Sequence, residues 1–180
     1  SDGYPSSSSK EAGIHHINYS YNQSSIVGIF KHEIPHENEA VQIFLPSGPL
    51  AILPLSGNRS SFVWTNETNE AERIFNLNDL HFLNELNTAF QNRRGQIQLD
   101  SKKSMFPISL TIPKKVIKER FVIIGDTAHK IHPIAGQGLN LGIRDVAALA
   151  EVLILSRRLG EDIGSKLVLN KYSKWRNLDV

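Results

Sequence analysis

An apolar run that ends in Gly-Asp and leads into a glycine-rich helix start constrains this chain more than any other feature. The stretch from Arg120 to Asp145 reads RFVIIGDTAHKIHPIAGQGLNLGIRD. Residues 121–124 are apolar throughout, which predicts a strand covered on both faces. Gly125 allows a sharp backbone turn, and Asp126 then places a carboxylate beyond the carboxyl end of that strand.

A helix is predicted to follow, and glycines surround its start at Gly136, Gly138 and Gly142. Its expected apolar face is made of Ile143, Val146, Ala147, Ala150 and Leu153. The first N–H groups of a helix are unpaired and carry the positive end of its dipole, so this start favours an electron-rich partner. A buried strand followed by an ordinary core helix is the alternative interpretation of the same stretch.

This stretch resembles the flavin-binding Gly-Asp motif of the single-component aromatic hydroxylases, which are FAD monooxygenases with the para-hydroxybenzoate hydroxylase fold. It is most similar to their ubiquinone-biosynthesis branch, whose signature is His-Pro-aliphatic-small-Gly-Gln-Gly-x-Asn-x-Gly-x-x-Asp. The matching residues are His132, Pro133, Ile134, Ala135, Gly136, Gln137, Gly138, Asn140, Gly142 and Asp145.

The resemblance implies which residues bind the cofactor. Gly125 and Asp126 match the Gly-Asp pair, whose carboxylate accepts hydrogen bonds from the ribityl chain of FAD. The backbone of Gly136, Gln137, Gly138, Leu139 and Asn140 is expected at the pyrimidine edge of the isoalloxazine ring, with His132 and Pro133 close to the ring. No side chain is predicted to be catalytic, because the cofactor carries the chemistry.

The first residues offer part of a second family motif, Asp-Gly-x-x-Ser-x-x-Arg. Asp2, Gly3 and Ser6 match it, and an Ala-Gly-Ile segment follows at residues 12–14. Ser9 stands where the family has arginine, which weakens any role in holding a pyrophosphate, because serine brings no charge. The alternative interpretation of SDGYPSSSSK is a frayed terminus rich in turn formers.

The middle of the chain is rich in predicted strands. Turn residues between them indicate an antiparallel meander. The expected strands are 25–34, 41–45, 50–55, 60–65 and 105–112, the last at an edge because of Pro107. A packing helix is expected over 79–93, with Gly95 as its stop, and a final packing segment over 164–177. In that segment Tyr172, Arg176 and Asp179 match a family run that packing and salt bridging explain.

The implied fold class is mixed α+β and α/β: a mostly antiparallel substrate domain plus the strand-helix part of an FAD-binding domain. The expected division is 1–14 for the Asp-Gly motif, 15–117 for the substrate domain and 118–180 for the Gly-Asp motif and helices. No Gly-x-Gly-x-x-Gly fingerprint follows an N-terminal strand. The chain is therefore expected to be a C-terminal fragment that lacks the Rossmann section.

Composition limits the other classes of function. A net charge of +2, with no basic stretch interleaved with aromatic residues, argues against a nucleic-acid partner. The absence of cysteine excludes disulfides and thiolate metal sites. The series Asp126, His129, His132 suggests a metal site, but no nearby residue completes a first shell and Pro133 interrupts the helix, so none is predicted. A cytoplasmic protein is the simplest interpretation.

The resemblance implies hydroxylation of the aromatic ring of a ubiquinone precursor of the polyprenyl phenol type, with FAD, NAD(P)H and O2. The isolated chain is expected to be inactive and to bind FAD weakly or not at all. A lipid-tailed substrate would favour peripheral association with a membrane or with a ubiquinone-biosynthesis complex. Two alternatives stay open: another flavin enzyme such as a halogenase, epoxidase or reductase, and a non-enzymatic remnant that binds a partner or a quinone-like lipid.

Overall fold

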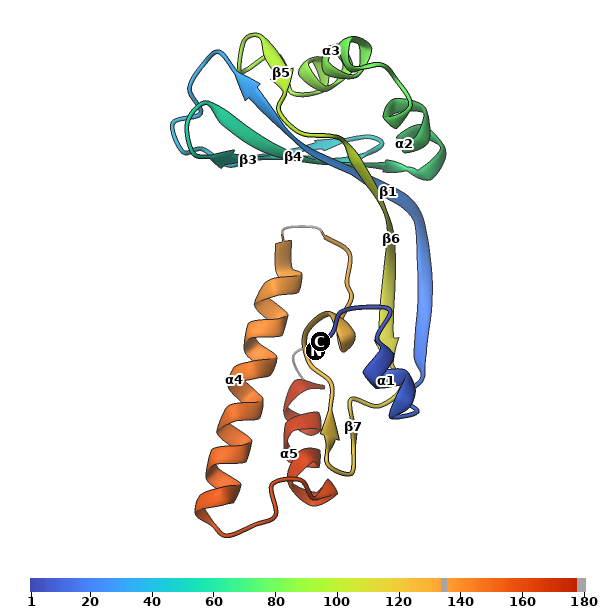
Figure 1. Cartoon of the computed structure of the whole chain (residues 1–180), viewed down its shortest axis with the longest axis vertical. Helices are drawn as coiled ribbons and strands as arrows, with labels where there is room; N and C mark the ends of the chain where they lie inside the picture. The colour runs from blue at the N-terminus through green and yellow to red at the C-terminus, as the bar shows by residue number, and fades with distance from the viewer. Residues whose placement is uncertain (134–135, 178–180) are drawn as a thin grey trace. The chain divides into compact units, whose positions relative to one another are not determined.

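The computed structural model of the chain describes residues 1–133 and 136–177 (Figure 1). Ile134 and Ala135 of the signature, and Asp179 of the C-terminal run, lie outside the described residues. The chain divides into two compact units. The first combines residues 1–20 with 109–180, and the second is residues 21–108. Two long strands, β1 (His16–His32) and β6 (Ser104–Pro113), contribute residues to both units.

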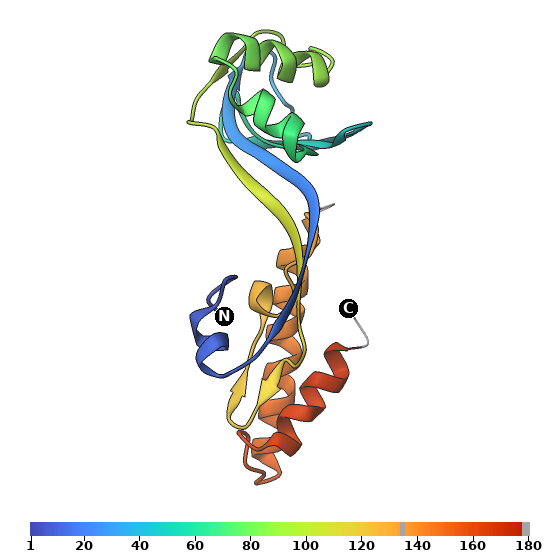
Figure 2. The ribbon, with the colours of Figure 1, turned by 90° about the vertical axis from the view of Figure 1, so that its right-hand side faces the viewer.

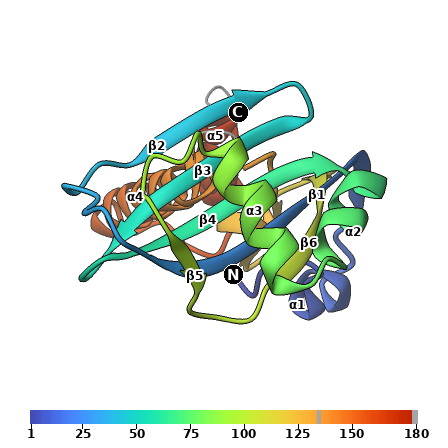
Figure 3. The ribbon, with the colours of Figure 1, turned by 90° about the horizontal axis from the view of Figure 1, so that it is seen from above.

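The second unit is built on an antiparallel sheet with strand order β2, β3, β4, β1, β5, in which β6 also pairs with β1 (Figure 3). The meander expected from the turn residues is confirmed for its central part. The remaining strands are β2 (Val41–Leu45), β3 (Gly48–Leu55), β4 (Arg59–Glu67) and β5 (Ile97–Leu99).

One face of this sheet packs against two helices, α2 (Thr68–Phe75) and α3 (Asp79–Ala89). On β4 the side chains of Phe62 and Trp64 are buried while Val63 is half-buried, because successive residues of a strand point to opposite faces. The buried core is Ile26, Phe30, Leu50, Ile52, Phe62, Trp64, Ala71, Ile74, Phe82, Leu86 and Phe90.

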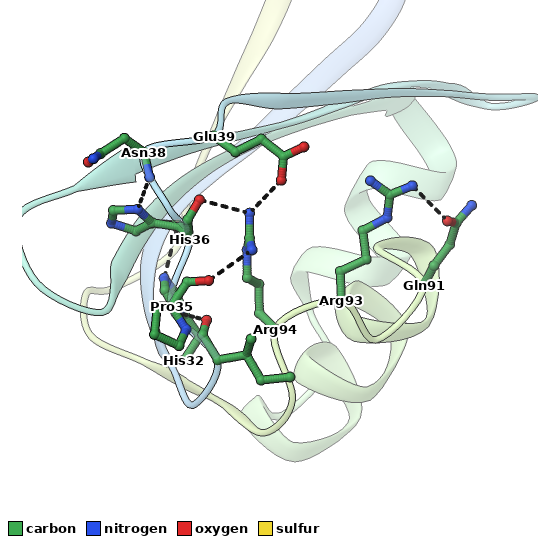
Figure 4. Close-up of polar contacts among 10 residues, drawn as sticks. His32, Pro35, His36, Asn38, Glu39, Gln91, Arg93 and Arg94 are labelled. Carbon is green, nitrogen blue, oxygen red and sulfur yellow. Dashed lines mark hydrogen bonds and ion pairs between the residues drawn. The ribbon is translucent and has the colours of Figure 1, made fainter.

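A buried arginine ties the connection between β1 and β2 to the end of α3 (Figure 4). Arg94 donates to the carbonyl oxygens of Pro35 at 3.1 Å and His36 at 3.4 Å, and it pairs with Glu39 at 3.1 Å. Its neighbour Arg93 is exposed and donates to the Gln91 side chain at 3.3 Å. One side chain from a distant part of the sequence therefore contacts three residues of this connection.

The first unit is mainly helical and has its own core (Figures 1 and 2). Its long helix α4 packs against α5, and α4 also contacts the turn before it. The elements are α1 (Ser7–Glu11), β7 (Ile117–Lys118), β8 (Phe121–Val122), the 3-10 turn η1 (Gly125–Thr127), α4 (Gln137–Arg158) and α5 (Lys166–Arg176). No helix among the described residues has both the length and the apolar character that a membrane crossing requires.

The expected strand over 121–124 is only partly correct. Phe121 and Val122 form β8, which pairs antiparallel with the short β7. The Ile123 N–H still donates to the Val116 carbonyl at 2.9 Å, but Ile123 and Ile124 lie outside the strand. The alternative interpretation of residues 1–10 as a frayed terminus is not supported, because α1 begins there at Ser7 with Ser6 as its N-cap. Helix α2 was not predicted at all.

Two helix predictions need correction. Helix α3 ends at Ala89 and not at Arg93, because Gln91 and Asn92 both have positive φ, which stops the helix before Gly95. The predicted apolar face of α4 is not its buried face: Ile143 and Val146 are more than half exposed. The buried residues of α4 are Asp145, Ala148, Val152 and Ser156.

Candidate functional site

The Gly-Asp turn, residues 125–127, begins where the backbone leaves its extended conformation. Gly125 has φ +64°, in the left-handed region that glycine occupies without strain. Its carbonyl oxygen accepts from the N–H groups of Ala128 and His129, both at 2.8 Å. This short 3-10 turn leaves the Asp126 side chain exposed at its centre.

A buried carboxylate from α4 holds the start of the turn. Asp145 is fully buried and accepts from the Gly125 N–H at 2.8 Å and from Arg176 Nε at 2.6 Å. Its Oδ1 also lies 3.3 Å from His129 Nε2. Burial alone would raise the pKa of Asp145, but these donors outweigh it and hold the pKa below its usual range. The aspartate that ends the signature is thus a structural anion.

Tyr172 and Arg176 of α5 take part in the same buried set of contacts around Asp145 and the strand before the turn. The Tyr172 hydroxyl is buried and donates to the Ile123 carbonyl at 3.4 Å, and burial together with the nearby Asp145 raises its pKa. Arg176 pairs with Asp145 inside the first unit. The packing and salt-bridging role expected for these two residues of the C-terminal run is confirmed.

Thr127 connects the turn to the first residues of the chain. Its hydroxyl donates to the Gly3 carbonyl at 2.9 Å and accepts from the Asp2 N–H at 3.3 Å. His16 Nε2 donates to the Thr127 carbonyl at 3.0 Å. The Gly-Asp turn and the partial Asp-Gly motif therefore meet, although Gly3 and Thr127 are 124 positions apart in sequence. Sequence reasoning missed Thr127, because a lone threonine carries no distinctive spacing.

The Asp2 side chain organises the start of α1. Its carboxylate accepts from the Ser6 hydroxyl at 2.6 Å and from the Ser8 N–H at 3.2 Å, and these bonds lower its pKa. Ser9, at the position where the family motif has arginine, is buried and donates to the Ser6 carbonyl at 3.2 Å. This helix presents no charge at that position.

The start of α4 faces the Gly-Asp turn. Gly136, with φ +64°, forms its N-cap, and none of the described side chains caps it. A Cβ at Gly138 would lie 3.9 Å from Asp126 Oδ1, and one at Gly142 would lie 3.4 Å from the Gly125 Cα. The exposed Asp126 carboxylate thus lies beside a helix start that lacks an acidic residue over 137–140. Gln137, Leu139 and Asn140 are exposed there.

The segment between the turn and α4 contains the remaining predicted site residues. Pro133 is exposed, and its carbonyl accepts from the Gly136 N–H at 3.2 Å. His132 is half-buried, and burial lowers its pKa. Within residues 1–133 and 136–177, no group of three or more histidine or carboxylate side chains is placed to hold a metal ion.

The predicted site residues thus fall into two groups within the first unit. Asp126, Gly136 and Gly138 are brought together around an open helix start. Asp2 and Gly3 contact the turn through Thr127. Exposed backbone donors, an exposed carboxylate and glycines that leave space fit a flat polar cofactor with hydroxyl groups.

Comparison with known proteins identifies the family. The family model described as FAD binding domain matches residues 1–178. The chain belongs to this FAD-binding family. It is 39% identical over 178 residues to the ubiquinone hydroxylase UbiL of Rhodospirillum rubrum, covering 99% of this chain and 42% of that protein. It is 39% identical over 175 residues to an uncharacterized protein of Synechocystis sp., covering 97% of this chain and 42% of that protein.

Solved structures agree on the fold of this family member. The crystal structure of PqsL, a probable FAD-dependent monooxygenase from Pseudomonas aeruginosa, matches with a TM-score of 0.77 at 22% identity. The match covers 98% of this chain and 50% of PqsL. The predicted resemblance and the predicted fold class are confirmed. The chain spans less than half of the length of the two relatives above.

Proposed function

We propose that the Gly-Asp turn and the start of α4 bind the ribityl chain and the isoalloxazine ring of FAD. The position of Asp126 supports this, because its exposed carboxylate can accept several hydroxyl donors next to the helix start. The N–H groups following Gly136 can stabilise negative charge on the pyrimidine edge of a flavin. Gly125, Gln137, Leu139, Asn140, His132 and Pro133 complete the proposed contact region.

Asp2 and Gly3 contribute to the same site indirectly, through the turn that carries Asp126. Their contacts with Thr127 fix the turn that carries Asp126. Because the Asp2 carboxylate already accepts from Ser6 and Ser8, we assign it mainly to ordering this turn and α1. When bound, FAD would supply the redox chemistry, and these residues would bind and orient it.

We further propose that the protein hydroxylates the aromatic ring of a ubiquinone precursor, using NAD(P)H and O2 as cosubstrates. The observation that carries this proposal is the 39% identity to a ubiquinone hydroxylase over nearly the whole chain. A cytoplasmic location and peripheral association with a membrane or a biosynthetic complex are parts of the same proposal. So is the division of the chain into residues 1–14, 15–117 and 118–180.

Flavin binding is tested on the chain itself by following backbone amide signals during titration with FAD. We expect weak binding, with shifts confined to residues 125–127 and 136–140. Asp126→Ala should abolish these shifts, while Glu151→Ala, an exposed carboxylate elsewhere on the first unit, should leave them unchanged. Shifts that lie elsewhere, or that persist in Asp126→Ala, would refute the proposed site.

Activity is tested on the full-length gene product that contains this sequence. Supplied with FAD and a prenylated phenol, it should consume NAD(P)H and O2 and yield a ring-hydroxylated product. Bound flavin with halogenated, epoxidised or reduced product would show a different reaction on the same fold. Absence of both flavin absorbance and NAD(P)H oxidation would reject the enzyme proposal.

One observation favours the non-enzymatic alternative. Ser9 is buried within α1 and its hydroxyl is used by Ser6, so this position offers no cation for a pyrophosphate. If the protein is a non-enzymatic remnant, its full-length gene product should show no bound-flavin absorbance after incubation with FAD. It would still bind the prenylated phenol, which separates the two candidates.

A further inference from the structure

A pocket of about 310 Å³ lies in the first unit, where the segment that leads into β7 contacts helix α5 (Figure 1). Three lysines from two distant parts of the sequence line it. Lys114 and Lys115 come shortly before β7, and Lys166 is the first residue of α5. None of the described lining residues is acidic, and none belongs to the proposed flavin site. The pocket therefore collects three positive charges and no negative one from the residues that the structure describes.

The three ammonium groups are available to a ligand. All three lysines are exposed, and within residues 1–133 and 136–177 their side chains form no ion pair or hydrogen bond. The nearby Glu119 carboxylate accepts from the backbone N–H of Lys166 at 3.3 Å, and Glu119 does not line the pocket. A molecule that enters the pocket reaches these charges without displacing a protein partner.

Neutral polar groups line the same pocket along one side of α5. Asn170, Ser173 and Asn177 follow Lys166 at intervals of four, three and four residues, so all four lie on one face of the helix. Asn170 and Ser173 are half-buried, and their side chains have no hydrogen-bond partner among the described residues. An amide N–H and a hydroxyl can both donate, which adds directed donors to the three charges.

The chemistry of these groups favours phosphate over carboxylate. Lysine binds phosphate as a compact point charge with three donors, whereas planar carboxylates match the fork of arginine, and no arginine lines the pocket among the described residues. A terminal phosphate carries a charge of about −1.5 to −2 near pH 7, which suits several ammonium groups better than the single charge of a carboxylate.

We propose that this pocket binds a terminal phosphate group. The ammonium groups of Lys114, Lys115 and Lys166 balance its charge, and Asn170 and Ser173 donate to its oxygens. The group belongs either to a small soluble phosphate ester or to a phospholipid headgroup that ends in phosphate. Both phosphates of FAD are internal to the cofactor, so this site is separate from the proposed flavin site and does not depend on it.

The first test is a titration of the full chain with inorganic phosphate at pH 7.5, followed by NMR. The solution contains 100 mM NaCl, which screens exposed charges beyond about 10 Å. Phosphate should move the Asn170 side-chain amide signal and the backbone amide signals of 114–117 in a saturable way. Acetate, which carries one charge, should bind about tenfold more weakly.

Variants separate the pocket from a generally basic surface. Lys115→Gln and Lys166→Gln should each weaken phosphate binding about threefold, the loss expected for one exposed ion pair. Lys174→Gln removes an exposed lysine of the same helix that does not line the pocket, and it should weaken binding less than about twofold. These are exposed positions, so the variants should fold like the unmodified chain.

Vesicles distinguish the two sources of the phosphate. Phosphatidylcholine vesicles that contain phosphatidic acid, whose headgroup ends in phosphate, are compared with vesicles that contain phosphatidylglycerol, whose phosphate is internal. Sedimentation only with the phosphatidic acid vesicles, lost in Lys166→Gln, would assign the site to a lipid headgroup. Saturable phosphate binding without sedimentation would assign it to a soluble ester.

Three results would overturn the proposal. Shifts that do not saturate with phosphate would mean that the lysines form only a solvated surface. Equal affinity for acetate would mean that the pocket does not select a terminal phosphate. An equal loss of affinity in Lys174→Gln and Lys166→Gln would mean that diffuse charge, and not the pocket, attracts the anion.

Discussion

Asp145 holds three groups that come from different parts of the chain. Its oxygens contact the Gly125 N–H, Arg176 Nε and His129 Nε2, all inside the first unit. Arg176 is itself 1% exposed. Removing a carboxylate that contacts a buried guanidinium strongly lowers the free energy of unfolding. Asp145 is therefore expected to contribute more to stability than an exposed carboxylate does.

The first prediction concerns this pair. Asp145→Asn keeps an oxygen that can accept from Gly125 but removes the buried negative charge beside Arg176 Nε and His129 Nε2. We expect the free energy of unfolding to fall by about 3–5 kcal/mol. Urea denaturation measures it. Glu161→Gln, which breaks the exposed pair with Lys171, is the matched control and should cost under about 1 kcal/mol. Equal losses in the two variants would contradict the argument.

The second prediction is a pH dependence from His32. This side chain is buried, donates from Nδ1 to the Ile34 carbonyl at 2.9 Å and accepts at Nε2 from the Ser60 hydroxyl at 3.0 Å. Burial is the main cause that lowers the pKa of His32 from its usual value of 6.5. The folded state then binds fewer protons than the unfolded state near that pH. The contribution of neutral His32 to the free energy of unfolding is complete above pH 6.5. It is lost as the pH falls towards the pKa of His32 in the folded state.

The measurement is urea unfolding of the chain at pH 7 and pH 5. His32→Gln should reduce the difference in stability between the two pH values. His81→Gln, which changes an exposed histidine on α3, should preserve it. If His32→Gln and the unmodified chain lose the same stability between pH 7 and pH 5, His32 is not the group that titrates.

The sequence predicts the positions of residues that belong to a local motif. It does not predict contacts between residues that are far apart along the chain. Asp126 and Gly136 occupy fixed positions in a long local motif, so their place at the turn and at the start of α4 can be predicted from sequence, and their flavin-binding role stays a prediction. Thr127 and His129 lie between the same motifs, but their roles depend on partners far away in sequence, Gly3 and Asp145. Local spacing cannot encode such contacts.

At the scale of elements, α4 shows why hydrophobic periodicity can select the wrong face. The most apolar stripe contains Ile143 and Val146, which are exposed, while the buried face includes Asp145 and Ser156. The pairing of Asp145 with Arg176 on α5 helps to set the orientation of the helix, and periodicity counts only apolar residues. Strands β2, β3 and β4 were predicted well, because their alternation and their turn residues agree.

The third prediction concerns the connection between β1 and β2. Arg94→Met removes the donors to Pro35, His36 and Glu39 while keeping an apolar stem over Phe90. With about 1 kcal/mol for each hydrogen bond, we expect a loss of about 2–3 kcal/mol. Arg93→Met is the adjacent control and should be nearly neutral, because Arg93 is exposed. Its contact drawn in Figure 4 is with the side chain of Gln91. Thermal or urea unfolding compares the two, and a similar loss in both would refute the role of Arg94.

At the scale of the whole molecule, each compact unit has its own buried core and contains one tryptophan. Trp64 belongs to the second unit and Trp175 to the first. The sequence predicted an antiparallel part and a strand-helix part, but it could not show that β1 and β6 contribute residues to both. The strand expected over 25–34 is instead β1, which runs from His16 to His32, and only its pairing partners reveal where a unit ends.

The fourth prediction uses these two reporters. In a Trp64→Phe background the fluorescence follows the first unit, and in a Trp175→Phe background it follows the second. Asp145→Asn should shift the urea midpoint reported by Trp175 more than the midpoint reported by Trp64, because separate cores allow separate transitions. Equal shifts would show that the units unfold as one.

The contacts of the Gly-Asp turn also have a consequence for the order of folding. The turn contacts Gly3, His16 and Asp145, and Asp145 in turn contacts Arg176. Gly3 and His16 lie 124 and 111 positions before Thr127 in sequence. Contacts of such long sequence separation form late, because a large loop must close first. During synthesis on the ribosome, the turn cannot gain all of its supports until α5 has emerged. The most recognisable motif of the chain is therefore expected to be among the last parts to become ordered.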